Sequence, residues 1–161
     1  MSTALTTAIY RRLAGLEALT GAAFVQQQAL AALLAVDPDT LLPAVHKGNK
    51  SEVVVYPAIT FRSNVGMVNP HFSTSGIAID DTVYDMEIWE NTQSGTIIEQ
   101  IYSSVERLLD QRFGIAPALP VDNAGGRIFY ATAFVPITEL YDTNIRAWFG
   151  LCRWRFVEAR F

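Results

Sequence analysis

The feature that most constrains the fold is one amphipathic helix in the middle of the chain, expected over residues 94–113. Its apolar residues recur three and four positions apart, which places them on one helix face: Ile97, Ile98, Ile101, Val105, Leu108, Leu109 and Phe113. Ser94 is the expected N-cap, and Gly114 with Pro117 is expected to end the helix. An apolar stripe of this width has to be buried against a second layer of structure.

The segments expected to form that second layer have the composition of β-strands. Residues 53–65, 82–91, 127–137 and 146–160 are rich in β-branched and aromatic residues. Pro57 interrupts the first segment, so we expect an edge strand, a bulge, or a strand that begins only at Ala58. The segments 66–81, 114–126 and 138–145 carry Gly, Pro, Asn or Asp turn signals and are expected to be loops.

Two further helices are expected before the strands, over residues 3–14 and 22–36. Asp37-Pro38 ends the second one, and residues 37–52 form a connection that can hold one helical turn at 39–44. The order of elements predicts an α+β fold. It has a mostly antiparallel sheet of about four strands, on which the long amphipathic helix and the N-terminal helices pack. We expect one domain over residues 1–161, with 22–52 as a helical insert and connection.

Composition excludes several classes of protein. The sequence has no apolar run near the roughly 20 residues that cross a bilayer, so no membrane partner is expected. Arg11 and Arg12 lie inside an amphipathic pattern, which is not a secretory signal. The single cysteine, Cys152, cannot form an internal disulfide and fits a reducing compartment. A formal net charge of −4 argues against a broad nucleic-acid footprint.

The best place to look for a metal site is the strand that contains Asp85 and Glu87. These carboxylates are two residues apart and therefore point to the same side of an extended chain, as does Trp89. One nuclease arrangement adds a lysine close to such a pair, but here the lysines, Lys47 and Lys50, fall in a distant loop. A face turned toward solvent or a partner is the better interpretation.

Other catalytic patterns are missing. His46 and His71 have no metal-ligand spacing to each other or to Cys152. The sequence contains no Gly-x-Ser-x-Gly elbow and no phosphate-binding loop. We therefore expect no catalytic residue, no metal ligand and no cofactor, and a protein that is not an enzyme. A small α+β enzyme or ligand-binding domain, with a pocket built from loops 66–81 and 114–126, remains an alternative because a pocket needs no motif.

Arginine alternates with aromatic residues near the C-terminus. Arg153 and Arg155 alternate with Trp154 and Phe156, a pattern that could stack bases and hold phosphates. The favoured interpretation is an outer strand with its charges on one side and its aromatic residues packed inward. Acidic residues concentrate over 80–110 and arginines over 146–160, which would suit complementary contacts between copies.

The order of segments resembles the tail terminator (tail completion) proteins of long-tailed bacteriophages. The resemblance is carried by TAIYRRLAGLEALTG, VYPAITFRSN, TVYDMEIWENT, SGTIIEQIYSSVERLLDQ and the C-terminal ELYDTNIRAWFGLCRWRFVEARF. It covers most of the chain except residues 22–52. A neighbouring neck protein, such as a head-closure or head-tail joining component, and a homodimeric interaction module are the alternatives.

The resemblance implies a virion protein of the tail or neck, assembled in the host cytoplasm, that forms a homo-oligomeric ring, typically of six copies. Such a ring sits on the tail tube protein, stops tube polymerisation and meets the head connector or neck protein, and the genome DNA passes through its lumen without specific binding. Candidate residues for the assembly or lumen surface are Asp85, Glu87, Trp89, Arg153 and Arg155.

Overall fold

The computed structural model describes residues 3–48, 55–64, 69–72, 78–92, 95–120 and 127–160. Within these ranges the helices are α1 (Thr3–Leu13), α2 (Gly21–Leu33) and α3 (Gly95–Leu109), followed by a 3₁₀ turn, η3 (Gln111–Phe113). The strands are β1 (Val45–Lys47), β2 (Ala58–Ser63), β3 (Asn69–Phe72), β4 (Ala78–Glu90), β5 (Leu119–Pro120), β6 (Arg127–Asp142) and β7 (Ala147–Arg160). The expected α+β class is confirmed.

The described strands form one sheet in the order β1-β2-β4-β7-β6-β5, and β3 also pairs with β4. The pairing is mixed: β1 and β2 run parallel, and the other described pairs run antiparallel. The sheet therefore has seven described strands, where the sequence predicted about four. The additional strands β1, β3 and β5 have three, four and two residues, which is too short for a periodic pattern to reveal them.

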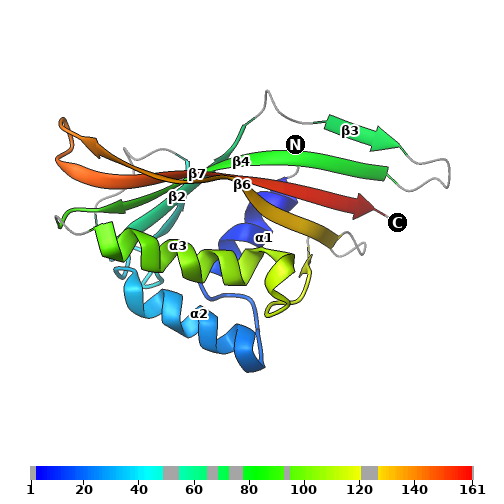
Figure 1. The fold of residues 1–161 in the computed structure, drawn as a ribbon. Helices are drawn as coiled ribbons and strands as arrows, with labels where there is room; N and C mark the ends of the chain where they lie inside the picture. Colours follow the sequence, from blue (N-terminus) through cyan, green and yellow to red (C-terminus); the bar gives the residue numbers. More distant parts are fainter. Residues whose placement is uncertain are drawn as a thin grey trace.

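The described helices cover one face of the sheet, as expected. α3 lies against β4, β6 and β7, and α2 lies on the side of α3 that faces away from the sheet (Figure 1). The predicted stripe is buried at Ile98, Ile101, Val105, Leu108 and Leu109, each at most 1% exposed. Ile97 is half-buried against the same core, whereas the expectation for Phe113 is wrong, because its side chain is 47% exposed.

The helix ends explain this difference. α3 stops at Leu109 because Asp110 adopts an extended conformation, and its side chain accepts a hydrogen bond from the backbone N–H of Arg112. The next residues form η3, which ends at Gly114 with a positive φ of 63°. Phe113 is thus rotated off the stripe. α2 likewise ends at Leu33, before the predicted boundary at 36, and the predicted N-cap Ser94 lies outside the described residues.

All three segments expected to be loops contain strand, and in 114–126 this strand is β5. Within 66–81 lie β3 and the start of β4, which pair with each other. In this pairing Asn69 lies opposite Asp81, and Phe72 lies opposite Ala78. Within 138–145, β6 continues to Asp142 and only residues 143–146 form the turn. Asp142 allows so short a turn, because its Oδ1 accepts hydrogen bonds from the N–H groups of Asn144 (2.9 Å) and Ile145 (3.2 Å).

The remaining expectations for the connections are met in part. β2 begins at Ala58, which was one of the three alternatives for the segment around Pro57. Residues 38–40 form a single turn in which the Leu41 N–H donates to the Asp37 carbonyl at 2.8 Å, in place of a helical turn over 39–44. The turn signals at residues 123–126 lie outside the described residues.

Close packing of α3 on the sheet depends on Gly150 in β7. A Cβ atom at this position would lie 2.5 Å from Ile137 Cδ1 and 2.6 Å from Ile98 Cγ2. Glycine therefore lets the helix approach the strand backbone. Two residues after Ile137 in β6, the carboxylate of Glu139 lies against Gly95 at the start of α3, where a negative charge is favourable to the helix dipole.

Candidate assembly surface

The two faces of β4 differ as the sequence predicted. Tyr84, Met86 and Ile88 point toward the helices and are at most 1% exposed. Asp85 and Glu87 point to the opposite face and are half-buried. We call this opposite face the open face, and define it by Asp81, Asp85, Glu87 and Trp89 of β4, Thr60 and Arg62 of β2, and Phe149, Arg153 and Arg155 of β7.

Ion pairs join β4 and β7 across the open face. Asp85 lies directly opposite Arg153, whose Nε donates to Asp85 Oδ1 at 2.7 Å. Arg155 lies opposite Val83 and reaches diagonally to Asp81, with Nε at 2.9 Å from Oδ1 and 2.8 Å from Oδ2. The acidic and basic segments, which the sequence suggested could meet between copies, therefore pair with each other within one chain.

Glu87 and Trp89 belong to the same surface through β2. The hydroxyl of Thr60 donates to Glu87 Oε2 at 3.4 Å and accepts from Trp89 Nε1 at 3.2 Å. The ring of Trp89 stacks on Phe149, with centroids 4.6 Å apart and planes at 24°, and Trp89 is only 3% exposed. Trp89 thus anchors this end of the open face and presents little of its surface to a partner.

Sequence reasoning missed Asp81, Thr60, Arg62 and Phe149 as members of this surface. Asp81 was assigned to a loop, although it continues the same period of two as Asp85 and Glu87. That period was the signal that could have found it. Thr60 and Phe149 could not be found in this way, because their places depend on the register of β2 and β7 against β4.

The open face is balanced in charge and has no metal-ligand cluster among its described side chains. Its carboxylates Asp81, Asp85 and Glu87 are matched in number by Arg62, Arg153 and Arg155. In the described part of the chain, no three His, Cys, Asp or Glu side chains converge as metal ligands would. His46 instead lies with its Nδ1 3.8 Å from Asp37 Oδ2, and Lys47 lies over the ring of Tyr10, 5.0 Å from its centroid.

The aromatic residues of β7 face inward. Trp154 and Phe156 are both 0% exposed within the core, while Trp148 is half-buried. This confirms the expected division into a charged side and an aromatic side, but the expected outer position is wrong, because β7 lies between β4 and β6 and pairs with both. Base stacking would require exposed rings, and the rings of Trp154 and Phe156 are buried. Cys152, on the same inner face, is also fully buried, and burial raises the pKa of its thiol to about 12.

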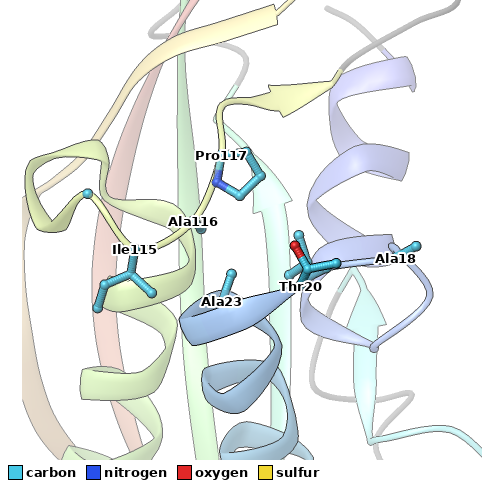
Figure 2. A pocket seen from close by; sticks show the side chains of 8 residues that line it. Ala18, Thr20, Ala23, Ile115, Ala116 and Pro117 are labelled. Atoms are coloured by element: carbon cyan, nitrogen blue, oxygen red, sulfur yellow. The ribbon is translucent and has the colours of Figure 1, made fainter.

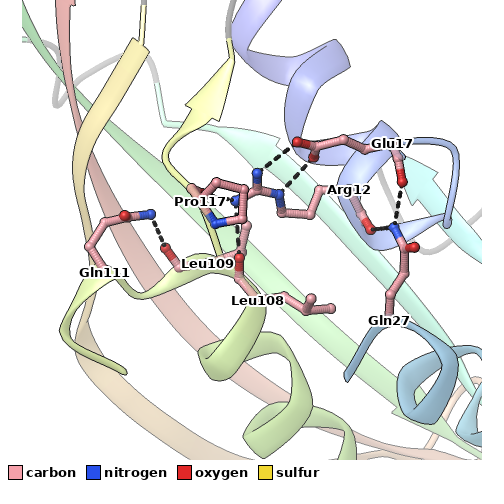
Figure 3. A network of polar contacts seen from close by, with 7 residues as sticks. All are labelled: Arg12, Glu17, Gln27, Leu108, Leu109, Gln111 and Pro117. Carbon is pink, nitrogen blue, oxygen red and sulfur yellow. Dashed lines mark hydrogen bonds and ion pairs between the residues drawn. The ribbon is translucent and has the colours of Figure 1, made fainter. Parts of the chain in front are cut away.

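At the far end of α3, Arg12 joins three segments of the chain although its side chain is fully buried (Figure 3). Its Nε and Nη2 each donate to a carboxylate oxygen of Glu17 at 2.7 Å. Its Nη1 donates to the carbonyls of Leu108 (3.2 Å) and Pro117 (2.7 Å). Leu108 offers one of the last carbonyls of α3, where a cation is favourable to the helix dipole.

Arg12 thereby fixes the two loops that form a cleft of about 390 Å³ (Figure 2). The lining residues are Ala18, Leu19 and Thr20 before α2, Ala23 in α2, and Gly114, Ile115, Ala116 and Pro117 after η3. The lining has no charged side chain, and its small residues leave loop backbone exposed. We call it the end cleft. It uses one of the two loops, 114–126, that the sequence suggested for a pocket.

Asp110, four residues before the cleft residue Gly114, is a carboxylate with a shifted pKa. Burial alone would raise the pKa of Asp110, but hydrogen bonds from Arg112, its positive charge and the Thr132 hydroxyl hold the pKa below its ordinary value. Arg112 contacts this carboxylate at 2.6 Å through Nη2. The described groups at this end of the molecule are thus organised as structural ion pairs.

None of the described helices is long and apolar enough to span a membrane.

Comparison with known proteins gives one kind of match. No protein-family model matches this sequence, and no curated protein matches it. Among solved structures, the fold is similar to that of a chain in a structure described as "Virion of native gene transfer agent (GTA) particle", with a TM-score of 0.59 at 13% identity. The match covers 96% of this chain and 94% of that chain. At this identity the likeness shows a shared fold, which spans almost the whole of both chains.

Proposed function

We propose that this protein is a structural component of a phage-type virion, and more specifically a ring-forming tail terminator. The observation that carries the proposal is the fold likeness to a chain of a gene transfer agent virion, because it spans nearly the full length of both chains. The order of sequence segments supports the finer assignment. In this role about six copies close a ring on the tail tube, stop its polymerisation and present a surface to the head connector.

The open face supports a role in assembly or in the lumen. Its arginines Arg153 and Arg155 already bind carboxylates of the same chain, so few of its charges remain to neutralise phosphates. Adhesion to DNA grows with each neutralised phosphate. A lumen lined by this balanced surface would let the genome pass without sticking. A contact between copies would instead depend on Asp85 and Glu87 for its register.

Stoichiometry tests the proposal. The native mass of the purified chain is measured over a concentration series, alone and with tail tubes as template, and the particles are imaged by negative stain. A ring of about six copies with a central hole supports a tail terminator or its nearest alternative, another neck protein. A strict two-fold dimer, or a monomer that ignores tail tubes, would overturn the proposal and favour a ligand-binding domain that uses the end cleft.

Exchanging Asp85→Asn together with Glu87→Gln separates the two roles of the open face. Loss of rings assigns the face to a contact between copies. Intact rings with altered DNA passage assign it to the lumen, and no change in either removes it from the candidate surface. Tube length in particles assembled with and without the protein then distinguishes a terminator, whose absence gives overlong tubes, from a head-closure component.

A further inference from the structure

The β6–β7 hairpin projects an apolar tip from one end of the molecule (Figure 1). Leu140, Tyr141 and Ile145 are 43%, 47% and 41% exposed. Leu140 and Tyr141 are consecutive residues of a strand, so their side chains point to opposite faces. Each face of the tip therefore keeps an apolar side chain partly exposed, although the ring of Tyr141 also contacts Trp148, with centroids 5.1 Å apart. Large apolar residues grouped in this way mark a contact site more often than single ones do.

The end cleft lies at the other end of the molecule. α3 begins beside Glu139 at the base of the hairpin and runs for 15 residues, which corresponds to about 22 Å. The cleft loop at 114–117 follows the far end of this helix. Phe24 and Phe113, which are next in sequence to the lining residues Ala23 and Gly114, are 46% and 47% exposed. A projection and a hollow at opposite ends can join copies head to tail.

The charges of the two ends are complementary. Around the hairpin and the start of α3, the described acidic residues outnumber the basic ones: Glu99, Glu139 and Asp142 against Arg146. Around the cleft, Arg12 is paired with Glu17 and Arg112 with Asp110, and Arg11 adds a positive charge. Arg11 also lines a second, smaller hollow of about 120 Å³ that shares Ala18 with the end cleft. Opposite excess charge favours one end of a copy meeting the other end of the next.

We propose that the tip of the β6–β7 hairpin of one copy binds the end cleft of the next copy. This inference rests on the proposed ring and names the contact that closes it. Ile145 enters the hollow, and the polar turn residues Thr143 and Asn144 meet the exposed loop backbone. The Arg12 network holds the cleft in shape before binding, which reduces the cost of ordering it. A single contact of this size is weak, so ring closure or a tail-tube template completes assembly.

The test uses two variants that each remove one end of the contact. Ile145→Asp places a charge on the hairpin tip. Thr20→Glu adds bulk and negative charge to the cleft, and it preserves the fold because the Thr20 side chain makes no capping hydrogen bond and a carboxylate is favourable at the start of α2. Leu41→Asp is the matched control, since Leu41 is 78% exposed and belongs neither to the hairpin tip nor to the cleft lining.

We expect each variant alone to associate at least about tenfold more weakly than the control, which keeps the wild-type behaviour. Mixed together, the two variants should form a dimer and stop there, because each supplies one intact end. A two-fold contact would give no such complementation. If both variants assemble as well as the control, the hairpin–cleft contact is wrong, even where the ring itself forms. Normal rings of Thr20→Glu that no longer bind tail tubes would also overturn it and make the tube protein the occupant.

A cross-linking measurement separates this inference from the ring. Ile145→Cys and Thr20→Cys chains carrying different tags are mixed under oxidising conditions, with Leu41→Cys in place of Ile145→Cys as control. The native Cys152 does not interfere, because it is buried. A selective cross-link without rings supports the contact and refutes the ring. A cross-link no stronger than the control's refutes the contact, whatever the wild type assembles into.

Discussion

The two faces of the central strands β4 and β7 use the same backbone for different purposes. On the inner face, Trp154, Phe156 and Met86 are almost completely buried beneath the helices. On the open face, one residue away along the same strands, Arg153 and Asp85 pair in partial contact with solvent. Burial of apolar surface supplies most of the stability of a fold, whereas exposed ion pairs contribute little. We therefore expect the inner face to hold the protein together and the open face to be free to serve assembly.

The contrast between the inner face and the open face is tested most strongly at Trp154. Trp154→Ala should lower the free energy of unfolding by about 3–5 kcal/mol, because it removes a fully buried ring and leaves a cavity. Its neighbour on the opposite face provides the control: Arg153→Ala should cost at most about 1 kcal/mol. Urea denaturation followed by circular dichroism measures both. Equal losses at the two positions would contradict the division of roles.

The next effect concerns Arg12, whose charged side chain is fully buried on the helix side of the sheet. Arg12→Met removes both hydrogen bonds to Glu17 and those to the Leu108 and Pro117 carbonyls. The carbonyls and the carboxylate then lose a charged donor, so we expect a loss of about 2–4 kcal/mol. Arg11→Met, in the adjacent exposed position, should change stability little. A denaturation midpoint that is the same for both variants would show that the network is not structural.

A smaller loss is expected from Gly150→Ala. The added Cβ would meet Ile137 and Ile98 at 2.5 and 2.6 Å, and the resulting overpacking should cost about 1–3 kcal/mol. Ile137→Ala in the same chain makes space for this methyl group. The double variant should therefore lose less than the sum of the two single variants. If the double variant instead lost the sum of the two single losses in thermal unfolding, α3 would be able to move away from β7 without resistance.

Local patterns predicted the parts of the fold that local physics decides. The period of α3 and the alternation in β4 are set by residues within a few positions, and both were found. The full length of the β6–β7 hairpin was not found, because the side chain of Asp142 supports a four-residue turn where a longer loop was expected. The pairing of Asp85 with Arg153 was also missed, since it depends on a register between strands 68 residues apart in sequence. The end cleft depends on Arg12 joining loops that no periodic pattern connects.

The smallest expected effect is the coupling between Asp85 and Arg153. Both side chains are in contact with water, at 14% and 38% exposure, so their attraction is screened and partly offset by the entropy lost on pairing. A double-mutant cycle with Asp85→Asn and Arg153→Gln should give a coupling energy below about 1 kcal/mol, decreasing with added salt. The same cycle for Asp81 and Arg155 should give a larger coupling energy, because the Asp81 side chain is only 7% exposed. If the Asp85 pair instead proved as costly to break as Trp154, the open face would be a structural element, and its use as an assembly surface would have to rest on residues other than these charges.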